Sequence, residues 1–292
     1  QFGAAVQTCN LAVGTWVPWA AGGIGVVATQ ALAERSYGTR GLELMRAGKS
    51  APETLKALLS LDPKPEMRQV SMIDAAGNIA THTGRCCIAE AGVYIGDAFC
   101  TQSNMAASDR VWTAMAEAYQ EAKGDFATRL LNALDAAEAA GGDLRGKQTA
   151  ALLIVDSQPS DIPLIDLRVD HDVDPLGQLR RLLRLHQAYM LEIEINAYAD
   201  GGDTEPVYEL IQKIGQLAPD EPYLKCLRAL HLVRVLGRRE EALSLLRPLV
   251  EEAPVWLEYL KRELRSGQET ACPGFDPQLL AELDPVAGSQ KV

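Results

Sequence analysis

Positive charge and long apolar runs are scarce in this sequence, and each shortage excludes a class of partner. Lys and Arg number 28 against 39 Asp and Glu, which gives a formal net charge of −11. A nucleic-acid binder normally needs a basic face, and anionic lipid likewise attracts basic segments. No apolar run approaches the ~20 residues that a membrane-spanning helix requires. We therefore expect neither nucleic acid nor a membrane as a partner.

The chain also lacks the spacings typical of metal sites and disulfide frameworks. Its six cysteines are scattered without a C-x-x-C pair, and its four histidines show no H-x-x-x-H spacing. His171 with Asp172 and Asp174 has cation-binding groups, but a polar loop after a strand explains the same residues and is the interpretation we favour. We predict no metal and no cofactor, and we favour a cytoplasmic location because a disulfide framework is disfavoured.

Strand-like and helix-like segments alternate over residues 1–185. Small apolar residues at Gly3–Thr8 and Gly22–Gln30 favour tightly packed strands, and a Gly-Asn turn between Gln69–Asp74 and Ile79–Gly84 is typical of a β-hairpin. Several strands are adjacent along the chain, which predicts a layered α+β fold and not a Rossmann sheet. The remaining predicted elements are helices at Tyr37–Ala47, after Ser50 and after Ser108, an extended segment at Tyr94–Ala106, and strands at Thr149–Asp156 and Leu164–Val169.

From Pro175 onward the pattern is helical. The unit from Pro219 to Ala253, with Ala229 and Gly237 at the small-residue and turn positions, resembles a tetratricopeptide repeat. Fewer than three such repeats are not usually stable alone, so we expect these helices to pack on the first domain or on a second copy, as a homodimer. We predict a domain over residues 1–186, a tetratricopeptide-like region over 187–265, and a tail over 266–292 with one short helix near Pro277–Leu283.

Three polar segments stand where packing alone would choose apolar residues. Ala28-Thr29-Gln30 ends an apolar strand and either faces a cleft or caps the strand. Thr101-Gln102-Ser103-Asn104 offers donors for a developing oxyanion, or a turn before the next helix. The loop over residues 141–148 is bounded by glycines. In it, Asp143 and Arg145 could orient each other, or Arg145 could bind a substrate carboxylate. The alternative is that the two residues form only a surface ion pair.

A combination of short motifs then resembles a known family. The motifs are Gly3-Ala4-Ala5-Val6-Gln7, Val17-Pro18-Trp19-Ala20, Gly23-Ile24-Gly25-Val26-Val27-Ala28-Thr29-Gln30, Ser36-Tyr37-Gly38, Gly41-Leu42-Glu43-Leu44-Met45-Arg46-Ala47-Gly48, Arg68-Gln69-Val70, Gly141-Gly142-Asp143-Leu144-Arg145-Gly146 and Asp166-Leu167-Arg168-Val169-Asp170. Together they resemble the domain of unknown function 1028 family, an uncharacterised branch of the N-terminal-nucleophile hydrolase-like proteins, over about residues 1–186. Some members carry a tetratricopeptide-like C-terminal region.

The resemblance implies a four-layer αββα sandwich and a particular chemistry. In that superfamily the nucleophile is the first residue of the mature chain (Thr, Ser or Cys) on the first strand, and its own α-amino group is the general base. Family members begin with a strand ahead of the segment that matches Gly3, and Gln1 has no nucleophilic side chain. We therefore expect the nucleophile on a strand ahead of Gln1, so that no catalytic residue is assigned within this sequence.

The expected activity is hydrolysis of the C–N bond of a small amide substrate. Thr29, Gln30 and Asn104 are predicted to contact the substrate or the oxyanion, and Asp143 and Arg145 to orient the terminal amine or to bind an anionic group. The alternative is a catalytically silent scaffold whose helical region binds a protein partner or mediates dimerisation.

Overall fold

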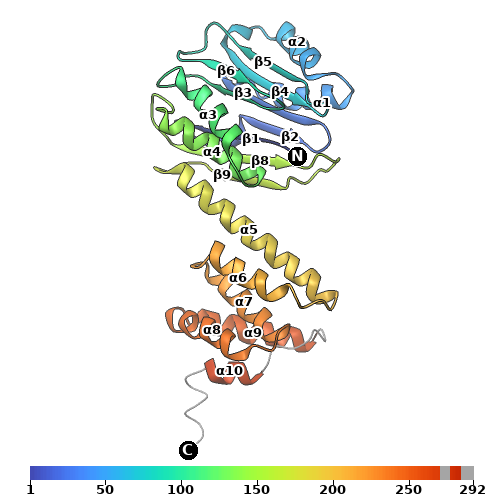
Figure 1. Cartoon of the computed structure of the whole chain (residues 1–292), viewed down its shortest axis with the longest axis vertical. Coiled ribbons are helices and arrows are strands. Elements are labelled where there is room, and N and C mark those ends of the chain that lie inside the picture. Colours follow the sequence, from blue (N-terminus) through green and yellow to red (C-terminus); the bar gives the residue numbers. More distant parts are fainter. Residues whose placement is uncertain (270–276, 284–292) are drawn as a thin grey trace, which may run out of the picture. The chain divides into compact units, whose positions relative to one another are not determined.

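A computed structural model describes residues 1–269 and 277–283 and contains two compact units, Gln1–Leu182 and Leu183–Val292 (Figure 1). The predicted class is confirmed, because several antiparallel sheets precede a helical C-terminal half. The predicted domain limits stay a prediction. Within the described ranges no helix is both long and apolar enough to cross a membrane.

A four-stranded antiparallel sheet in the order β2-β3-β4-β5 forms one layer of the first unit. Helices α1 and α2 cover one of its faces, where Val27, Val70 and Met72 are fully buried (Figure 1). Because side chains alternate along a strand, Gln30 and its neighbours at every second position lie on the opposite face. The elements are β2 (Pro18–Ala21), β3 (Gly25–Ala31), β4 (Arg68–Asp74), β5 (Ile79–Thr83), α1 (Ser36–Arg46) and α2 (Ala51–Leu61).

Local signals in the sequence explain several of these boundaries. The β4–β5 hairpin is confirmed. Ser50 caps α2 through a capping box with Glu53, in which Ser50 N donates to Glu53 Oε2 at 2.9 Å. Pro18 opens an edge strand, where a residue without an N–H is tolerated. The strand predicted to begin at Gly22 begins at Gly25 instead, because Ile24 N bonds Ala21 O at 3.1 Å in the turn between β2 and β3.

A buried ion pair ties the end of α2 to the start of β4. Arg68 Nε donates to Asp62 Oδ2 at 2.7 Å, and the two side chains are only 7% and 4% exposed. Asp62 also accepts from Tyr37 Oη of α1 at 3.0 Å, and Arg68 Nη1 donates to Leu32 O at 2.5 Å. The hydrogen bond from Arg68 lowers the pKa of Asp62 to about 2. This network therefore holds α1, α2 and β4 together through a charge that has little access to water.

A three-stranded antiparallel sheet in the order β1-β8-β9 forms the next layer. β1 contacts β2 and β3 of the first sheet, and α4 packs on β1 and β8 from the other side, so the layers run helices, sheet, sheet, helices (Figure 1). A separate hairpin, β6–β7, packs on α3. The elements are β1 (Phe2–Thr8), β6 (Gly92–Ile95), β7 (Cys100–Ser103), α3 (Arg110–Glu121), α4 (Phe126–Ala139), β8 (Thr149–Val155) and β9 (Ile165–Val169), with short 3-10 turns η1 (Val13–Thr15) and η2 (Pro65–Met67).

Two local predictions in this layer are wrong. The segment Tyr94–Ala106 is not one extended piece, because a turn with Ala98 at a φ of 57° divides it into β6 and β7. Ser108 does not cap α3; its hydroxyl donates instead to Ala140 O at 3.3 Å, and Asp109 occupies the N-cap. Helix α4 ends at Ala139, just before Gly141 and Gly142, which both have positive φ.

Among the described strands, β1 is paired on one edge only. All seven of its residues pair with β8, and no described strand pairs with its other edge. An unpaired edge presents a row of backbone N–H and C=O groups that can add another strand. This edge lines the cavity described below.

The second unit is a stack of helices with its own apolar core. Ile195, Ile211, Leu224 and Leu246 are fully buried in it. Within the predicted tail, a helix extends to Glu269 and a short helix covers Pro277–Leu283; the rest of that tail lies outside the described residues. The helices are α5 (Pro175–Asp200), which begins in the first unit, α6 (Val207–Leu217), α7 (Pro222–Arg234), α8 (Arg239–Glu252), α9 (Val255–Glu269) and α10 (Pro277–Leu283).

Candidate functional site

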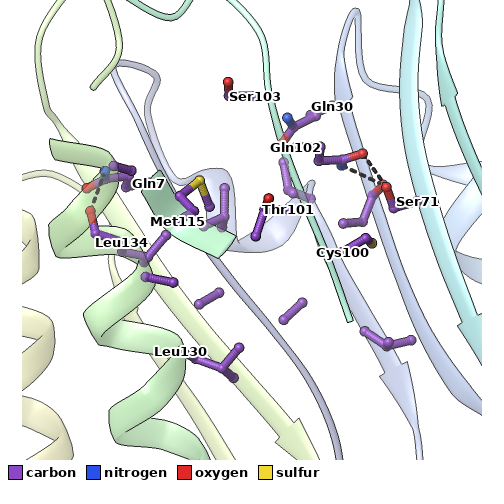
Figure 2. A pocket seen from close by; sticks show the side chains of 18 of the residues that line it. Gln7, Gln30, Ser71, Cys100, Thr101, Gln102, Ser103, Met115, Leu130 and Leu134 are labelled. Atoms are coloured by element: carbon purple, nitrogen blue, oxygen red, sulfur yellow. Dashed lines mark hydrogen bonds between the residues drawn. The ribbon is translucent and has the colours of Figure 1, made fainter. Parts of the chain in front are cut away.

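A cavity of about 720 Å³ lies in the first unit, alongside the free edge of β1. Every residue from Gln1 to Thr8 lines it, whereas a strand that presented one face would contribute alternate residues. β3 contributes Val26, Ala28 and Gln30 from one face. Apolar side chains of α3 and α4, including Met115, Leu130 and Leu134, complete the wall (Figure 2). The cavity is thus mainly apolar along its length, with polar groups in a few places.

The first polar group lies where β1 ends. Asp143 Oδ2 accepts from Thr8 Oγ1 at 2.8 Å and from Cys9 N at 3.1 Å. The Arg145 guanidinium donates to both carboxylate oxygens, from Nε at 3.0 Å and from Nη2 at 2.8 Å, and its Nη2 also reaches Thr8 Oγ1 at 3.2 Å. Burial raises the pKa of Asp143, but the hydrogen bonds from Arg145, Cys9 and Thr8 outweigh it and lower that pKa overall. The carboxylate is therefore ionised and fixed in place at neutral pH.

The second polar group is a network of side-chain amides centred on Gln69, which is fully buried on β4. Gln69 Oε1 accepts from Gln30 Nε2 at 2.7 Å and from Asn104 Nδ2 at 3.2 Å. Gln69 Nε2 is held by Ser103 O at 2.8 Å and by Thr83 Oγ1 at 3.1 Å, so the amide cannot rotate without losing these acceptors. Gln30 and Asn104 are therefore fixed at the cavity wall through a shared acceptor.

Two further side-chain atoms in the cavity wall are buried without a hydrogen-bond partner among the described residues. They are Gln7 Oε1 and Ser103 Oγ. The other end of the Gln7 amide donates to Leu134 O at 3.0 Å, as Figure 2 shows. Gln102 is different, because its Oε1 accepts from Ser71 Oγ at 2.5 Å and its Nε2 donates to Ala28 O at 3.3 Å. An unpaired buried polar atom costs free energy unless a ligand or water satisfies it.

The structure brings together four of the five site residues predicted from the sequence. Gln30, Asn104, Asp143 and Arg145 all line the cavity. The segment after Asn104 connects the two polar groups, since Ala106 forms a β-bridge with Asp143. Thr29 lies elsewhere: it is fully buried on the opposite face of β3, and its hydroxyl donates to Glu34 O at 3.4 Å.

Residues 1–179 match the sequence model of a family of unknown function, DUF1028. The chain belongs to this family. It is also similar to the crystal structure of protein SPO2555 from Silicibacter pomeroyi, a DUF1028 protein, at 32% sequence identity and a TM-score of 0.58. That similarity covers 62% of this chain and 78% of the SPO2555 chain. No curated protein matches this sequence.

Sequence reasoning missed several residues of this DUF1028 cavity. In the sequence Gln69 is part of a motif only, and Gln7 and Thr8 have the pattern of strand residues. The pairing of β3 with β4 puts Gln30 directly opposite Gln69, and two amides at adjacent positions of one sheet face were the available signal. Nothing local in the sequence could bring Thr8 next to Asp143, because that contact depends on how the loop after α4 meets the end of β1.

The described His, Cys, Asp and Glu side chains form no evident metal site or reactive-thiol site. Among the described residues no group of three His, Cys, Asp or Glu side chains is positioned to hold a metal ion. The described cysteines, Cys9, Cys86, Cys87, Cys100 and Cys226, are unpaired thiols. Cys100 lines the cavity, where burial raises the pKa of its thiol and so disfavours a reactive thiolate.

Proposed function

We propose that this protein is an N-terminal-nucleophile hydrolase that cleaves a small amide, with its nucleophile on a strand that pairs with the free edge of β1. The observation that carries the proposal is the cavity that runs along this edge and ends at Asp143. The contacts of the first unit, with helices outside two facing sheets, support the same assignment. Membership of the DUF1028 family is compatible with this proposal, but the family has no assigned function.

The direction of β1 would place the nucleophile beside Asp143. A strand that precedes Gln1 through a tight turn must run antiparallel to β1. Its first residue would then lie next to the last residues of β1, where Thr8 and Cys9 hydrogen-bond Asp143. The fixed carboxylate of Asp143 is thus suited to orient a terminal amine, and we propose it as a positioning residue.

The proposed reaction follows from that arrangement. The terminal amine takes the proton of the Thr, Ser or Cys side chain as the oxygen or sulfur attacks the amide carbon. Donors in the cavity wall, with Asn104 foremost, stabilise the negative charge that develops on the carbonyl oxygen. The C–N bond then breaks, the amine leaving group receives the proton, and water hydrolyses the acyl-enzyme. Thr29 is not included, since its hydroxyl is buried away from the cavity.

Two experiments test this proposal with the full natural chain. Sequencing of the mature N-terminus should find Thr, Ser or Cys, and changing that residue to Ala should abolish amine release from an amide library. Amine release that survives the change would refute the mechanism.

The positioning role of Asp143 has its own readout. A carboxylate beside the terminal amine raises the pKa of that amine, so Asp143→Asn should move the acidic limb of the kcat/KM profile to lower pH. Asp166→Asn, on an exposed position of β9, removes the same charge elsewhere and should leave the profile unchanged. A parallel loss of activity without any movement of the limb would indicate a purely structural role.

A second candidate function is association through the second unit, for which we propose a tetratricopeptide-like arrangement. Aromatic rings on three of its helices pack together: Tyr223 of α7 stacks on Trp256 of α9 with centroids 6.4 Å apart, and Tyr189 of α5 lies 6.4 Å from Tyr223. Tyr223 is 38% exposed, so the cluster is open to a second copy or to a protein partner. Sedimentation of wild-type and Tyr223→Ala protein should show a weakened dimer; identical monomers for both would exclude dimerisation through this surface.

A further inference from the structure

We infer that Gln30, Asn104 and Ser103 form a specificity site for an uncharged head group that both donates and accepts hydrogen bonds, of which a carboxamide with an apolar tail is the simplest example. This inference names a substrate class for the hydrolase proposed above. It rests on that proposal for the reaction only, because binding to the site requires no turnover.

The side-chain amides of Gln30 and Asn104 keep unused hydrogen-bonding groups. Gln30 and Asn104 each donate one N–H to Gln69 Oε1. A side-chain amide has two N–H donors and a carbonyl acceptor, so each retains one donor and its carbonyl oxygen, and neither has a further partner among the described residues. A ligand group that matches such an edge must itself carry both a donor and an acceptor.

Ser103 provides the second, independent observation. Its hydroxyl oxygen is buried in the cavity wall without a partner among the described residues, although its backbone O holds Gln69. Figure 2 shows Ser103 and Gln30 on the same side of the pocket, away from the apolar Leu130. A buried hydroxyl left unpaired is costly, and a ligand carbonyl that accepts its proton removes that cost.

The lack of a counter-charge in the Gln69 network disfavours an acidic ligand head at this site. Among the described residues, no charged side chain belongs to the Gln69 network. At the other polar group, two of the three guanidinium nitrogens of Arg145 already bond Asp143, so that pair is neutral as a unit. A carboxylate head could accept from the remaining N–H donors, but it would lose water and meet two carbonyl oxygens without a counter-charge from the network, which costs more than burying a neutral amide. The wall of α3 and α4 then accommodates an apolar tail.

A matched pair of ligands tests the head-group preference. Hexanamide and hexanoate have tails of equal length and differ in charge and in the presence of N–H donors. Ligand-observed NMR titrations of the full chain should give a dissociation constant for hexanamide about tenfold lower than for hexanoate, or better. Equal affinity, or no binding of hexanamide at millimolar concentration, would overturn the inference.

The variant Ser103→Ala separates a binding role from a structural one. Because the Ser103 hydroxyl has no hydrogen-bond partner among the described residues, its removal relieves an unpaired buried group and should leave the unfolding midpoint unchanged or higher, while hexanamide binds about tenfold more weakly. Ser108→Ala is the control, since that hydroxyl bonds Ala140 O outside the cavity and should affect stability but not binding. Unchanged hexanamide affinity in Ser103→Ala would contradict the assignment.

Release of ammonia distinguishes this inference from the proposed function. If hexanamide binds selectively and no ammonia appears, the specificity site stands and the hydrolase proposal fails for this substrate. If ammonia is released from hexanamide but hexanoate binds as tightly as hexanamide, the proposed reaction stands and the specificity site fails.

Discussion

Replacing Asp62 by Asn should destabilise the first unit at neutral pH, because it leaves the charge of Arg68 buried without its partner. Both side chains are nearly inaccessible, at 7% for Arg68 and 4% for Asp62. The pKa of Asp62 falls from 3.8 to about 2 on folding, and at about 1.4 kcal/mol per unit this corresponds to about 2–3 kcal/mol of folding free energy. Removing one partner of a buried pair typically costs about 3–5 kcal/mol. We expect a loss of about 3 kcal/mol.

The pH dependence gives a second, independent check on this pair. The folded-state pKa of Asp62 lies below its unfolded value, so the ionised form is the one that folding favours. Its contribution is complete above about pH 4 and is lost as the pH falls through about 2. Wild-type and Asp62→Asn proteins should therefore differ in stability at pH 7 and converge toward pH 2.

Urea unfolding followed by tryptophan fluorescence measures this difference. Trp256 is the tryptophan of the second unit, so a Trp256→Phe background makes the signal specific to the first unit. Glu117→Gln is the matched control, because the Arg110–Glu117 pair is 65% and 59% exposed and should contribute less than about 0.5 kcal/mol. An Asp62→Asn protein as stable as this control at pH 7 would refute the reasoning.

Two further changes test packing and titration elsewhere in the chain. Gly38→Ala places a Cβ 2.2 Å from the ring of Trp19, so it should lower the free energy of unfolding by about 1–3 kcal/mol in the same urea assay despite the higher helix propensity of Ala; a gain in stability would contradict the packing. Burial lowers the pKa of His231 below 6.5, against a hydrogen bond to Glu192 that raises it. The unfolded chain therefore binds a proton more readily, and the thermal midpoint seen by Trp256 should fall as the pH drops below about 6.5 and do so less steeply in His231→Gln.

Local patterns in the sequence predicted much of the fold. The β4–β5 hairpin, the capping box at Ser50 and the short helix at Pro277–Leu283 are all set by residues within a few positions of one another. The pattern of Tyr94–Ala106 does not reveal its turn, because Ala98 has a positive φ, which alanine rarely adopts. Ser108 was mistaken for a cap because its competing acceptor, Ala140 O, is distant in the sequence.

The candidate site was only partly predictable for the same reason. Residue type identified Gln30 and Asn104, but their common acceptor on Gln69 depends on strand pairing and on the position of the β6–β7 hairpin. Thr29 and Gln30 are adjacent in sequence, and the alternation of a strand sends them to opposite faces. The sequence offered both residues as candidates, and only the register of the sheet separates them.

The unpaired edge of β1 would allow a separate molecule to bind at the cavity. A strand that adds to an exposed edge is held mainly by backbone hydrogen bonds, which do not require a covalent connection to Gln1. An extended peptide supplied in solution would therefore stabilise a chain that lacks a strand there, by an amount that grows with the logarithm of the peptide concentration. Addition of the strand to the sheet and binding of the peptide would then be one equilibrium, which a single peptide titration would measure.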